Sequence, residues 1–350
     1  MATPASSPST EQLAAQITSA PASAYASGLS AEQQAQFERD GYLVLPDFFS
    51  AATAAQLKAH VDTLVSQVDL SNHPRTVFKT DSSGSQTQLS SAAGQQAEDK
   101  NRYFLDSADK ISYFFEEQAW NADGTLAVPL SRALNKIGHA LHTLDPPFGA
   151  LTQRPEVSGV ARSLGFQRPA VLQSMVILKQ PRIGGQVVPH RDSTFLHTQP
   201  STAAGLWFAL EDCTKENGCL SFVPGSHKDG ASDRRFVRKE PPARLPTVNN
   251  PLPAGASAAD LSGPANVGVE LTFEGEDRRE YPTSDFLPAE VKAGTAILIH
   301  GDVVHASTHN HSERSRYIYT FHLIERKGAD YPTSNWLQSK KHFPMLGEER

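Results

Sequence analysis

The chain has 350 residues, of which 39% are hydrophobic, and this is enough apolar side chain for the core of one large globular domain with appendages. Its formal net charge is −6 and it has no long basic run, so nucleic acid is not an expected partner. No apolar run approaches the roughly 18 residues of a membrane span, and the N-terminus lacks the charged-then-apolar order of a signal peptide, so we expect a cytoplasmic protein without membrane contact.

The first part of the chain divides into a polar tail and a helical region. Residues 1–29 are rich in Ala, Ser, Pro and Thr, and this composition predicts a disordered tail. A helix is predicted to begin near Ser30 and to end before Gly41. A short strand over Tyr42–Leu45 and an amphipathic helix over about 50–68 are predicted to follow.

The next part of the chain is predicted to contain a loop and two more helices. Residues 71–101 are polar and predict a mobile loop. Apolar residues at helical spacing predict an amphipathic helix over about 131–144, which would place Lys136 on a helix. A further helix is predicted over Val157–Leu164.

After residue 170 the hydrophobic period changes from 3.6 to 2, which predicts short strands. The predicted strands are Val171–Leu178, Gly205–Leu210, Leu220–Val223, Thr295–Ile299 and Tyr317–Leu323. Helices followed by strands are typical of an α+β chain, here with a β-sandwich or jelly roll (double-stranded β-helix) core in its C-terminal half and flanking N-terminal helices. We therefore expect one domain over residues 30–345, interrupted by a Pro-, Ala- and Gly-rich insertion at 239–282 that is either disordered or a lid.

A His-x-Asp tripeptide on a strand can supply two ligands to one metal ion, because side chains two apart point to the same face. The chain has four, and they begin at His60, His190, His227 and His300. The first lies in a predicted helix, where residues two apart do not face each other, and reads as a surface feature. The third lies in a turn sequence, and the fourth, between two apolar runs, is predicted to form a hairpin turn. Only His190 and Asp192 are followed by a strand with another His and, soon after, an Arg, so they are the predicted ligands of a redox metal such as Fe(II).

The third ligand is either His300 or His305. A metal ligand should be held by rigid backbone, which disfavours His309 and His311 in their polar loop. His305 is favoured because it shares one face of an extended segment with Ser307. The alternative for His305 is a core histidine that binds no metal.

Arg316 begins a strand in which alternate residues, including Thr320 and His322, share one face. An inward arginine is costly unless its guanidinium meets a buried anion, and its planar fork suits a carboxylate. The spacing therefore favours a metal site that also binds a carboxylic acid. The alternative for Arg316 is one half of a structural ion pair.

Several segments of the sequence resemble the phytanoyl-CoA dioxygenase family of Fe(II)- and 2-oxoglutarate-dependent oxygenases. The similarity runs from about Gln33 to Leu337. The segments that carry it are Asp40–Leu45, Asn135–His142, Gln173–Met175, Glu216–Leu220, Pro224–His227, Ile299–His305, Arg314–Arg316, Tyr319–Leu323 and Asn335–Leu337. The 239–282 insertion does not match the family's pattern and is a candidate location for substrate specificity.

The resemblance implies roles for particular residues. It implies that His190, Asp192 and His305 hold the iron. It also implies that Arg316 and Ser307 bind the distal carboxylate of 2-oxoglutarate. Three further residues, which the sequence alone would assign to the surface or the core, are implied to complete that pocket: Lys136, Met175 and Trp207.

The predicted function is that of a dioxygenase that uses Fe(II), 2-oxoglutarate and molecular oxygen to hydroxylate an aliphatic C–H bond of a small-molecule substrate. An acyl-CoA and a carboxylic acid are candidate substrates. One alternative is a non-catalytic jelly-roll binding module that retains the metal site. Another is a zinc hydrolase, which the ligand set permits but which leaves Arg316 unexplained.

Overall fold

The computed structural model describes residues 8–71, 73–77, 97–230, 233–239, 270–276 and 279–347. In these ranges the helices are α1 (Thr10–Ser19), α2 (Ala31–Asp40), α3 (Ala51–Ser66), α4 (Ala97–Asp106), α5 (Leu141–Leu144), α6 (Pro146–Thr152) and α7 (Pro155–Ser163), joined by short 3-10 turns. A search of the same ranges finds no helix whose length and apolar character would let it cross a membrane.

The three helices predicted from Ser30 to before Gly41, over about 50–68 and over Val157–Leu164 are confirmed as α2, α3 and α7. Helix α2 illustrates the local signals that made these predictions possible. Ser30 and Gln33 form a reciprocal capping box at its start, which satisfies backbone N–H groups that have no partner within the helix. Gly41 ends the helix with φ 79°, a left-handed conformation that glycine adopts without steric cost. Strand β1 (Tyr42–Leu45) then begins directly, as predicted.

The prediction of a disordered tail over residues 1–29 is wrong for the residues that the structure describes. Helix α1 begins with a capping box at Ser9 and buries Leu13 and Ile17. The buried guanidinium of Arg154 donates to the carbonyl of Ile17 at 2.7 Å and pairs with Glu156 at 2.6 Å. The prediction was based on the low content of large apolar residues. The segment is held to the rest of the protein in large part by its backbone carbonyls, which side-chain composition does not report.

Replacing Arg154 with alanine is expected to lower the free energy of unfolding by about 3 kcal/mol, because Glu156 would be left buried without its partner. Hydrogen exchange over residues 10–27 should increase at the same time. Arg162→Ala is the matched control, since this exposed arginine donates only to the carbonyl of Ala26. Equal effects of the two substitutions would show that Arg154 does not anchor the segment.

The predicted helix over 131–144 is also wrong. Residues Leu134–His139 form strand β3, and only the one-turn helix α5 follows. Strand β3 pairs with β2 on one side and β4 on the other, with Lys136 opposite Ile177. Pairing with two strands overrides the local spacing of apolar residues, and Gly138 further disfavours a helix.

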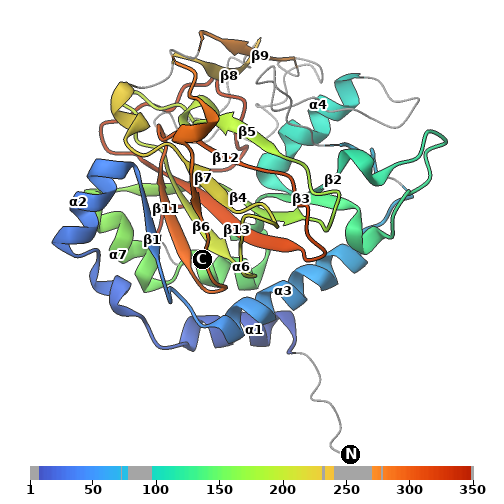
Figure 1. Cartoon of the computed structure of the whole chain (residues 1–350), viewed down its shortest axis with the longest axis horizontal. Helices are drawn as coiled ribbons and strands as arrows, with labels where there is room; N and C mark the ends of the chain where they lie inside the picture. The colour runs from blue at the N-terminus through green and yellow to red at the C-terminus, as the bar shows by residue number, and fades with distance from the viewer. Residues whose placement is uncertain are drawn as a thin grey trace, which may run out of the picture.

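Two antiparallel sheets form the centre of the molecule (Figure 1). The larger sheet has the order β1-β11-β6-β13-β4-β3-β2, with β2 (Ile111–Phe115), β4 (Pro169–Lys179), β6 (Ala204–Ala209), β11 (Ala296–His300) and β13 (Arg316–Glu325). The smaller sheet has the order β10-β7-β12-β5, with β5 (Val187–His190), β7 (Leu220–Phe222), β10 (Leu287–Ala289) and β12 (His305–Ser307). All five strands predicted after residue 170 are present, so the expectation of an α+β chain is confirmed, and the sheets are antiparallel.

The larger sheet is covered differently on its two faces. One face packs Leu206, Phe208 and Tyr319 against helical residues such as Leu57 and Val160. The other face packs against the smaller sheet through an apolar cluster that spans both sheets, made of Trp207, Ala209, Cys213, Cys219, Leu220, Phe222, Ala289, Val291, Ile297, Ile299, Val303 and Ile318. Figure 1 shows α1, α3 and α6 on one side of the larger sheet and β5 and β12 on the other, where α4 also lies. The space between the two sheets is where the site described below lies.

The turn at His300–Asp302 does not form the predicted hairpin. It connects β11 of the larger sheet to β12 of the smaller one. The Asp302 carboxylate accepts hydrogen bonds from the hydroxyls of Ser193 and Ser201. This His-x-Asp tripeptide therefore has a structural role in crossing between the sheets.

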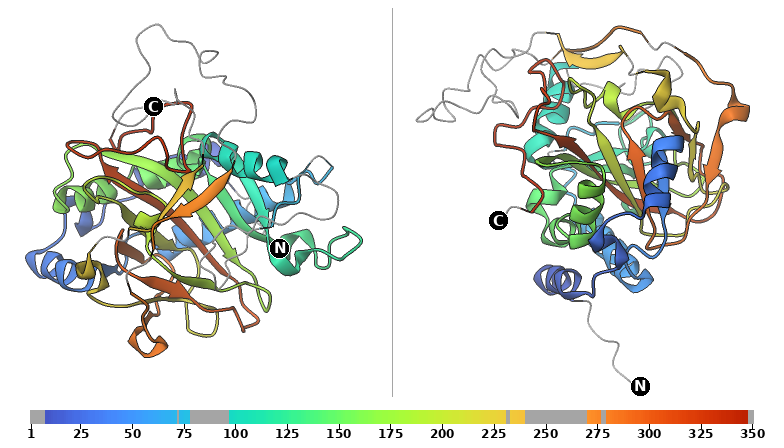
Figure 2. Two further views of the ribbon diagram at one scale, coloured as in Figure 1. Left: turned by 90° about the horizontal axis from the view of Figure 1, so that it is seen from above. Right: turned by 90° about the vertical axis from the view of Figure 1, so that its left-hand side faces the viewer.

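Two predicted loops fall largely outside the described residues. Of the insertion at 239–282, the structure describes residue 239 and residues 270–276 and 279–282, in which β9 (Leu271–Glu274) pairs with β8 (Arg235–Arg238). Figure 2 shows this pair at the opposite end of the molecule from α1. Of the loop predicted over 71–101, residues 97–101 instead begin helix α4.

Candidate functional site

A cavity of about 480 Å³ lies between the two sheets. All eight residues that the sequence analysis singled out line it: His190, Asp192, His305, Arg316, Lys136, Met175, Trp207 and Ser307. They come from strands of both sheets, and the antiparallel register places them on facing surfaces. In that register Thr320 of β13 lies opposite both Met175 and Trp207. The structure thus brings the predicted residues together in one place.

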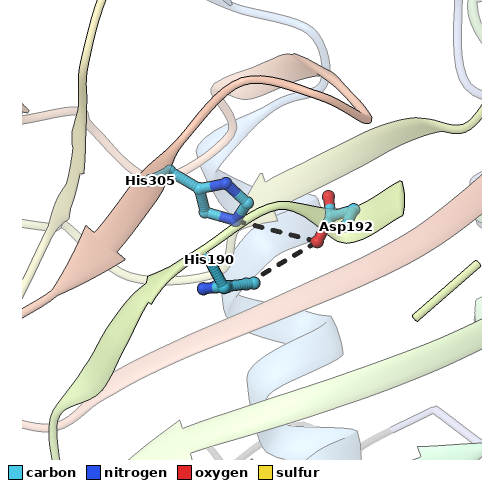
Figure 3. A group of neighbouring side chains, drawn as sticks. All are labelled: His190, Asp192 and His305. Carbon is cyan, nitrogen blue, oxygen red and sulfur yellow. Dashed lines mark ion pairs between the residues drawn. The ribbon is translucent and has the colours of Figure 1, made fainter. Parts of the chain in front are cut away.

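Three potential metal ligands converge at one side of this cavity (Figure 3). His190 at the end of β5 lies opposite His305 of β12 in the sheet register, and Asp192 follows β5 directly. The Asp192 Oδ1 atom is 3.7 Å from His190 Nε2 and 3.8 Å from His305 Nε2. All three ligand atoms lie within 4.8 Å of one another, which is close enough to share one ion.

The orientation of both imidazoles is fixed by the backbone. His190 Nδ1 lies 2.9 Å from the carbonyl of Val188, and His305 Nδ1 lies 3.2 Å from the carbonyl of Val303. A carbonyl can only accept, so each Nδ1 carries the hydrogen and each Nε2 presents a lone pair. Backbone partners of this kind fix the tautomer that a metal ligand needs.

The electrostatics of the triad give the protonation states that metal binding needs. Burial lowers the pKa of His190 to about 3, so its imidazole is neutral. Burial alone would raise the pKa of Asp192, but the nearby imidazoles of His322 and His305 outweigh this effect and the pKa is lowered. A neutral imidazole and an ionised carboxylate are the forms that coordinate a metal.

The other His-x-Asp tripeptides do not line the cavity. His60 Nε2 lies 2.7 Å from Asp145 Oδ2 and is largely buried, so the prediction that it is a surface feature is wrong. His227 Nε2 donates to the carbonyl of Glu38. His300 accepts the backbone N–H of Asp302, faces the ring of His227 and, unlike His305, does not line the cavity.

Arg316 lies in the cavity wall and is only 1% exposed. Its guanidinium is 5.7 Å from the ring centroid of Trp207. Among the described residues no carboxylate forms an ion pair with it, and its Nε has no hydrogen-bond partner. The alternative of a structural ion pair therefore has no support in the described part of the chain.

The remaining predicted residues surround the same space. Lys136 on β3 is 8% exposed, and burial lowers its pKa to about 7. The Ser307 hydroxyl donates its one hydrogen to the carbonyl of Gly218 at 2.9 Å. Met175 and Trp207 supply apolar wall on β4 and β6.

The sequence analysis missed several polar residues in the cavity wall, of which His322 is nearest to the triad. His322 Nε2 is 3.3 Å from Asp192 Oδ2, and Gln173 Nε2 is 3.3 Å from His322 Nδ1. Gly205 lies opposite His322, and a Cβ there would be 3.3 Å from Asp192 Oδ2, so a small residue suits this position. The alternation after Arg316 already placed His322 on the inward face, and this signal could have identified it.

Two buried charged residues, Glu116 and Lys179, were missed for a different reason. Lys179 lies opposite Arg316 in the register of β4 and β13 and donates to the carbonyls of Gly185 and Thr308. Glu116 follows β2 and is 2% exposed. Their burial depends on which strands pair, and no local pattern in the sequence reports that.

The stability of the protein is expected to fall as pH rises from about 4.5 to about 7, because burial raises the pKa of Glu116 from 4.5 to about 7. In that window the folded state holds more protons than the unfolded state, and the loss amounts to roughly 3 kcal/mol. Glu116→Gln should remove this part of the slope in unfolding titrations. Glu117→Gln, at the exposed neighbouring position, is the control, and an equal loss of slope in both variants would contradict the assignment.

Comparisons with known proteins agree on one family. A family model described as Phytanoyl-CoA dioxygenase (PhyH) matches residues 37–318. Phytanoyl-CoA dioxygenase domain-containing protein 1 of Bos taurus is 42% identical over 318 residues, which are 91% of this chain and 97% of the relative. The homolog of that protein in Caenorhabditis elegans is 41% identical over 313 residues, which are 88% of this chain and 95% of the relative.

A solved structure shares the fold. The epimerase SnoN, determined in complex with Fe3+, alpha ketoglutarate and nogalamycin RO, superimposes with a TM-score of 0.51 at 16% identity and covers 86% of both chains. At this identity the likeness concerns the fold alone. The family model and the relatives cover most of the chain, and on their evidence the chain belongs to the phytanoyl-CoA dioxygenase family.

Proposed function

We propose that the protein is an Fe(II)- and 2-oxoglutarate-dependent dioxygenase that hydroxylates an aliphatic C–H bond of a small-molecule substrate. The observation that carries the proposal is the convergence, in one cavity, of three metal-type donor atoms and a buried guanidinium that has no ion pair among the described residues. We also infer that the two facing sheets form the double-stranded β-helix of such enzymes, and their antiparallel pairing supports this.

The donor set fits Fe(II). Two imidazole nitrogens and one carboxylate oxygen, from His190, His305 and Asp192, are the ligand types of non-haem iron oxygenases and leave positions open for other ligands. When bound, iron together with 2-oxoglutarate and oxygen supplies the oxidation of the C–H bond, with succinate and carbon dioxide as co-products. The protein's part is to bind, to orient and to exclude water.

Another part of the cavity wall fits the distal carboxylate of 2-oxoglutarate. Arg316 offers a planar pair of N–H donors. The Ser307 hydroxyl lies in the same cavity wall and donates to the carbonyl of Gly218, so it would have to turn away from that carbonyl to donate to the carboxylate. Lys136 adds a positive charge when it is protonated, and a bound carboxylate would favour that form. Met175 and Trp207 cover this end with apolar surface, which strengthens the charged contacts by keeping water out.

The substrate class follows from the family and is the finer part of the proposal. The relatives from Bos taurus and C. elegans are named for a phytanoyl-CoA dioxygenase domain, which makes an acyl-CoA or a carboxylic acid the first class to test. The competing function is a binding module that holds metal without turnover. A zinc hydrolase would not explain why a guanidinium, that of Arg316, is buried in the cavity wall.

An anaerobic titration separates these functions. Adding Fe(II) and then 2-oxoglutarate to the full chain is expected to produce a visible charge-transfer band, and glutarate, which lacks the keto group, is expected to produce none. Admitting oxygen should then release succinate, faster with some members of a panel of acyl-CoAs and free acids. Metal binding with no band and no succinate would favour the binding module.

A further inference from the structure

One end of the cavity is lined by an imidazole held between aromatic rings. His139, the last residue of β3, is 2% exposed and lines the cavity together with Phe104 and Trp336. Its ring centroid lies 5.4 Å from that of Phe104 and 5.3 Å from that of Trp336, in edge-on arrangements. The two aromatic rings stack on each other at 4.5 Å. The position of this imidazole is therefore fixed by packing.

The hydrogen bonds of Ser107 determine which nitrogen of His139 carries the proton. The Ser107 hydroxyl oxygen lies 2.5 Å from the carbonyl oxygen of Phe104 and 2.6 Å from His139 Nδ1. Two oxygens this close must share a hydrogen, and only the hydroxyl has one to donate. The same oxygen must then accept the hydrogen on His139 Nδ1. In a neutral imidazole this leaves Nε2 as a bare lone pair.

The imidazole stays neutral. Burial lowers the pKa of His139 well below its ordinary value, and the nearby charges of Lys136 and His322 act in the same direction. No described residue donates a hydrogen bond to Nε2. Nε2 is not among the buried atoms that lack a partner, so it opens to the cavity, and a ligand that displaces water from it must supply a hydrogen-bond donor of its own.

We propose that His139 Nε2 accepts a hydrogen bond from a neutral hydroxyl or amide N–H group of the prime substrate, and that Phe104 and Trp336 pack against the carbon atoms next to that group. This assigns a substrate-binding residue and a ligand class to the cavity, and it rests on the function proposed above. An ionised carboxylate has no hydrogen to offer, so it is excluded from this end. A cation is disfavoured because Lys136 lies close enough for its charge to act on His139.

The test uses three probes of equal chain length: hexanamide, 1-hexanol and hexanoate. Their binding to the full chain loaded with Zn(II), a diamagnetic stand-in, and 2-oxoglutarate is measured by saturation-transfer NMR, so no turnover is needed. Hexanamide and hexanol are expected to bind about tenfold more tightly than hexanoate, the size of effect typical for one satisfied buried acceptor. Equal affinities of the three probes would overturn the proposal.

Variants separate the acceptor from the surrounding packing. His139→Phe keeps an aromatic ring but removes the lone pair, and it should abolish the preference for hexanamide. Ser107→Ala leaves the imidazole in place but lets either nitrogen hold the proton, so it should reduce the preference partially. His342→Phe, at an exposed position outside the cavity, is the matched control and should change nothing. If both variants at the cavity retain 2-oxoglutarate binding and the full preference, the proposal is wrong.

Failure of the proposed His139 subsite can be told apart from failure of the proposed oxygenase function. A normal charge-transfer band with no preference among the probes would remove the subsite and leave the oxygenase. A preference among the probes without a band would leave the subsite and remove the oxygenase.

Discussion

Replacing Asp192 with alanine is expected to abolish oxygen-dependent succinate formation. Asp192 is the only carboxylate of the triad, and without it only two imidazole ligands remain. Loss of groups that merely support metal ligands typically costs 10–100-fold in affinity or activity, so loss of the ligand itself should cost more than about 100-fold. Anaerobic measurement of bound Fe(II), followed by succinate assay in air, checks both parts of this expectation.

Asp229→Ala provides a matched control for that experiment. Asp229 belongs to another His-x-Asp tripeptide, but it is exposed and contacts Arg279 and Tyr281 away from the cavity. The variant should therefore bind iron normally. Succinate formation at the unaltered rate in Asp192→Ala would refute the assignment of Asp192 as a ligand.

Much of the fold could be predicted because the signals for it are local. Helix α2 has its cap and its terminating glycine in the sequence, and from Arg316 to His322 every second residue is aromatic, which is the period of a strand. His190 and Asp192 were found because their spacing fits a strand, and Arg316 because an inward cation needs an anion. These arguments need no knowledge of which strands pair.

The rest of the site depends on pairing, which no local pattern reports. Met175 and Trp207 join Thr320 only through the register of three strands, and the sequence by itself assigned them to the core. Lys136 was placed on a helix because apolar residues at 134, 137 and 141 mimic a helical face. Its place in the cavity follows from the pairing of β3 with β4. Only the resemblance to a family pointed to these three residues.

The choice between His305 and His300 shows the same limit. Both follow or end apolar runs, so local sequence leaves both open. The register of β12 against β5 sets His305 opposite His190, whereas His300 ends a strand of the other sheet. The chain passes from one sheet to the other over residues 301–304, and for this reason the imidazole of His305, not that of His300, lies next to Asp192.

Replacing Arg316 with leucine is expected to raise the KM for 2-oxoglutarate by about 100-fold, because two charge-assisted hydrogen bonds to the distal carboxylate are lost. Arg316→Lys should recover part of the affinity, since it keeps the charge but loses the planar fork. In the wild type, 2-oxoglutarate at a hundredfold excess over Kd should stabilise the folded state by about 2.7 kcal/mol, and at the same concentration this gain should fall to about 0.4 kcal/mol in Arg316→Leu.

The stability of the free protein distinguishes this role from a structural one. Breaking a buried ion pair typically costs about 3–5 kcal/mol, but Arg316 has no such pair among the described residues, so Arg316→Leu should leave the unfolding midpoint unchanged or raise it. Arg238→Leu is the control: this buried arginine donates to the carbonyl of Trp336, so its loss should lower the midpoint and leave the stabilisation by 2-oxoglutarate intact. A strongly destabilised Arg316→Leu protein that still gains stability from 2-oxoglutarate would show that the guanidinium holds the fold and not the co-substrate.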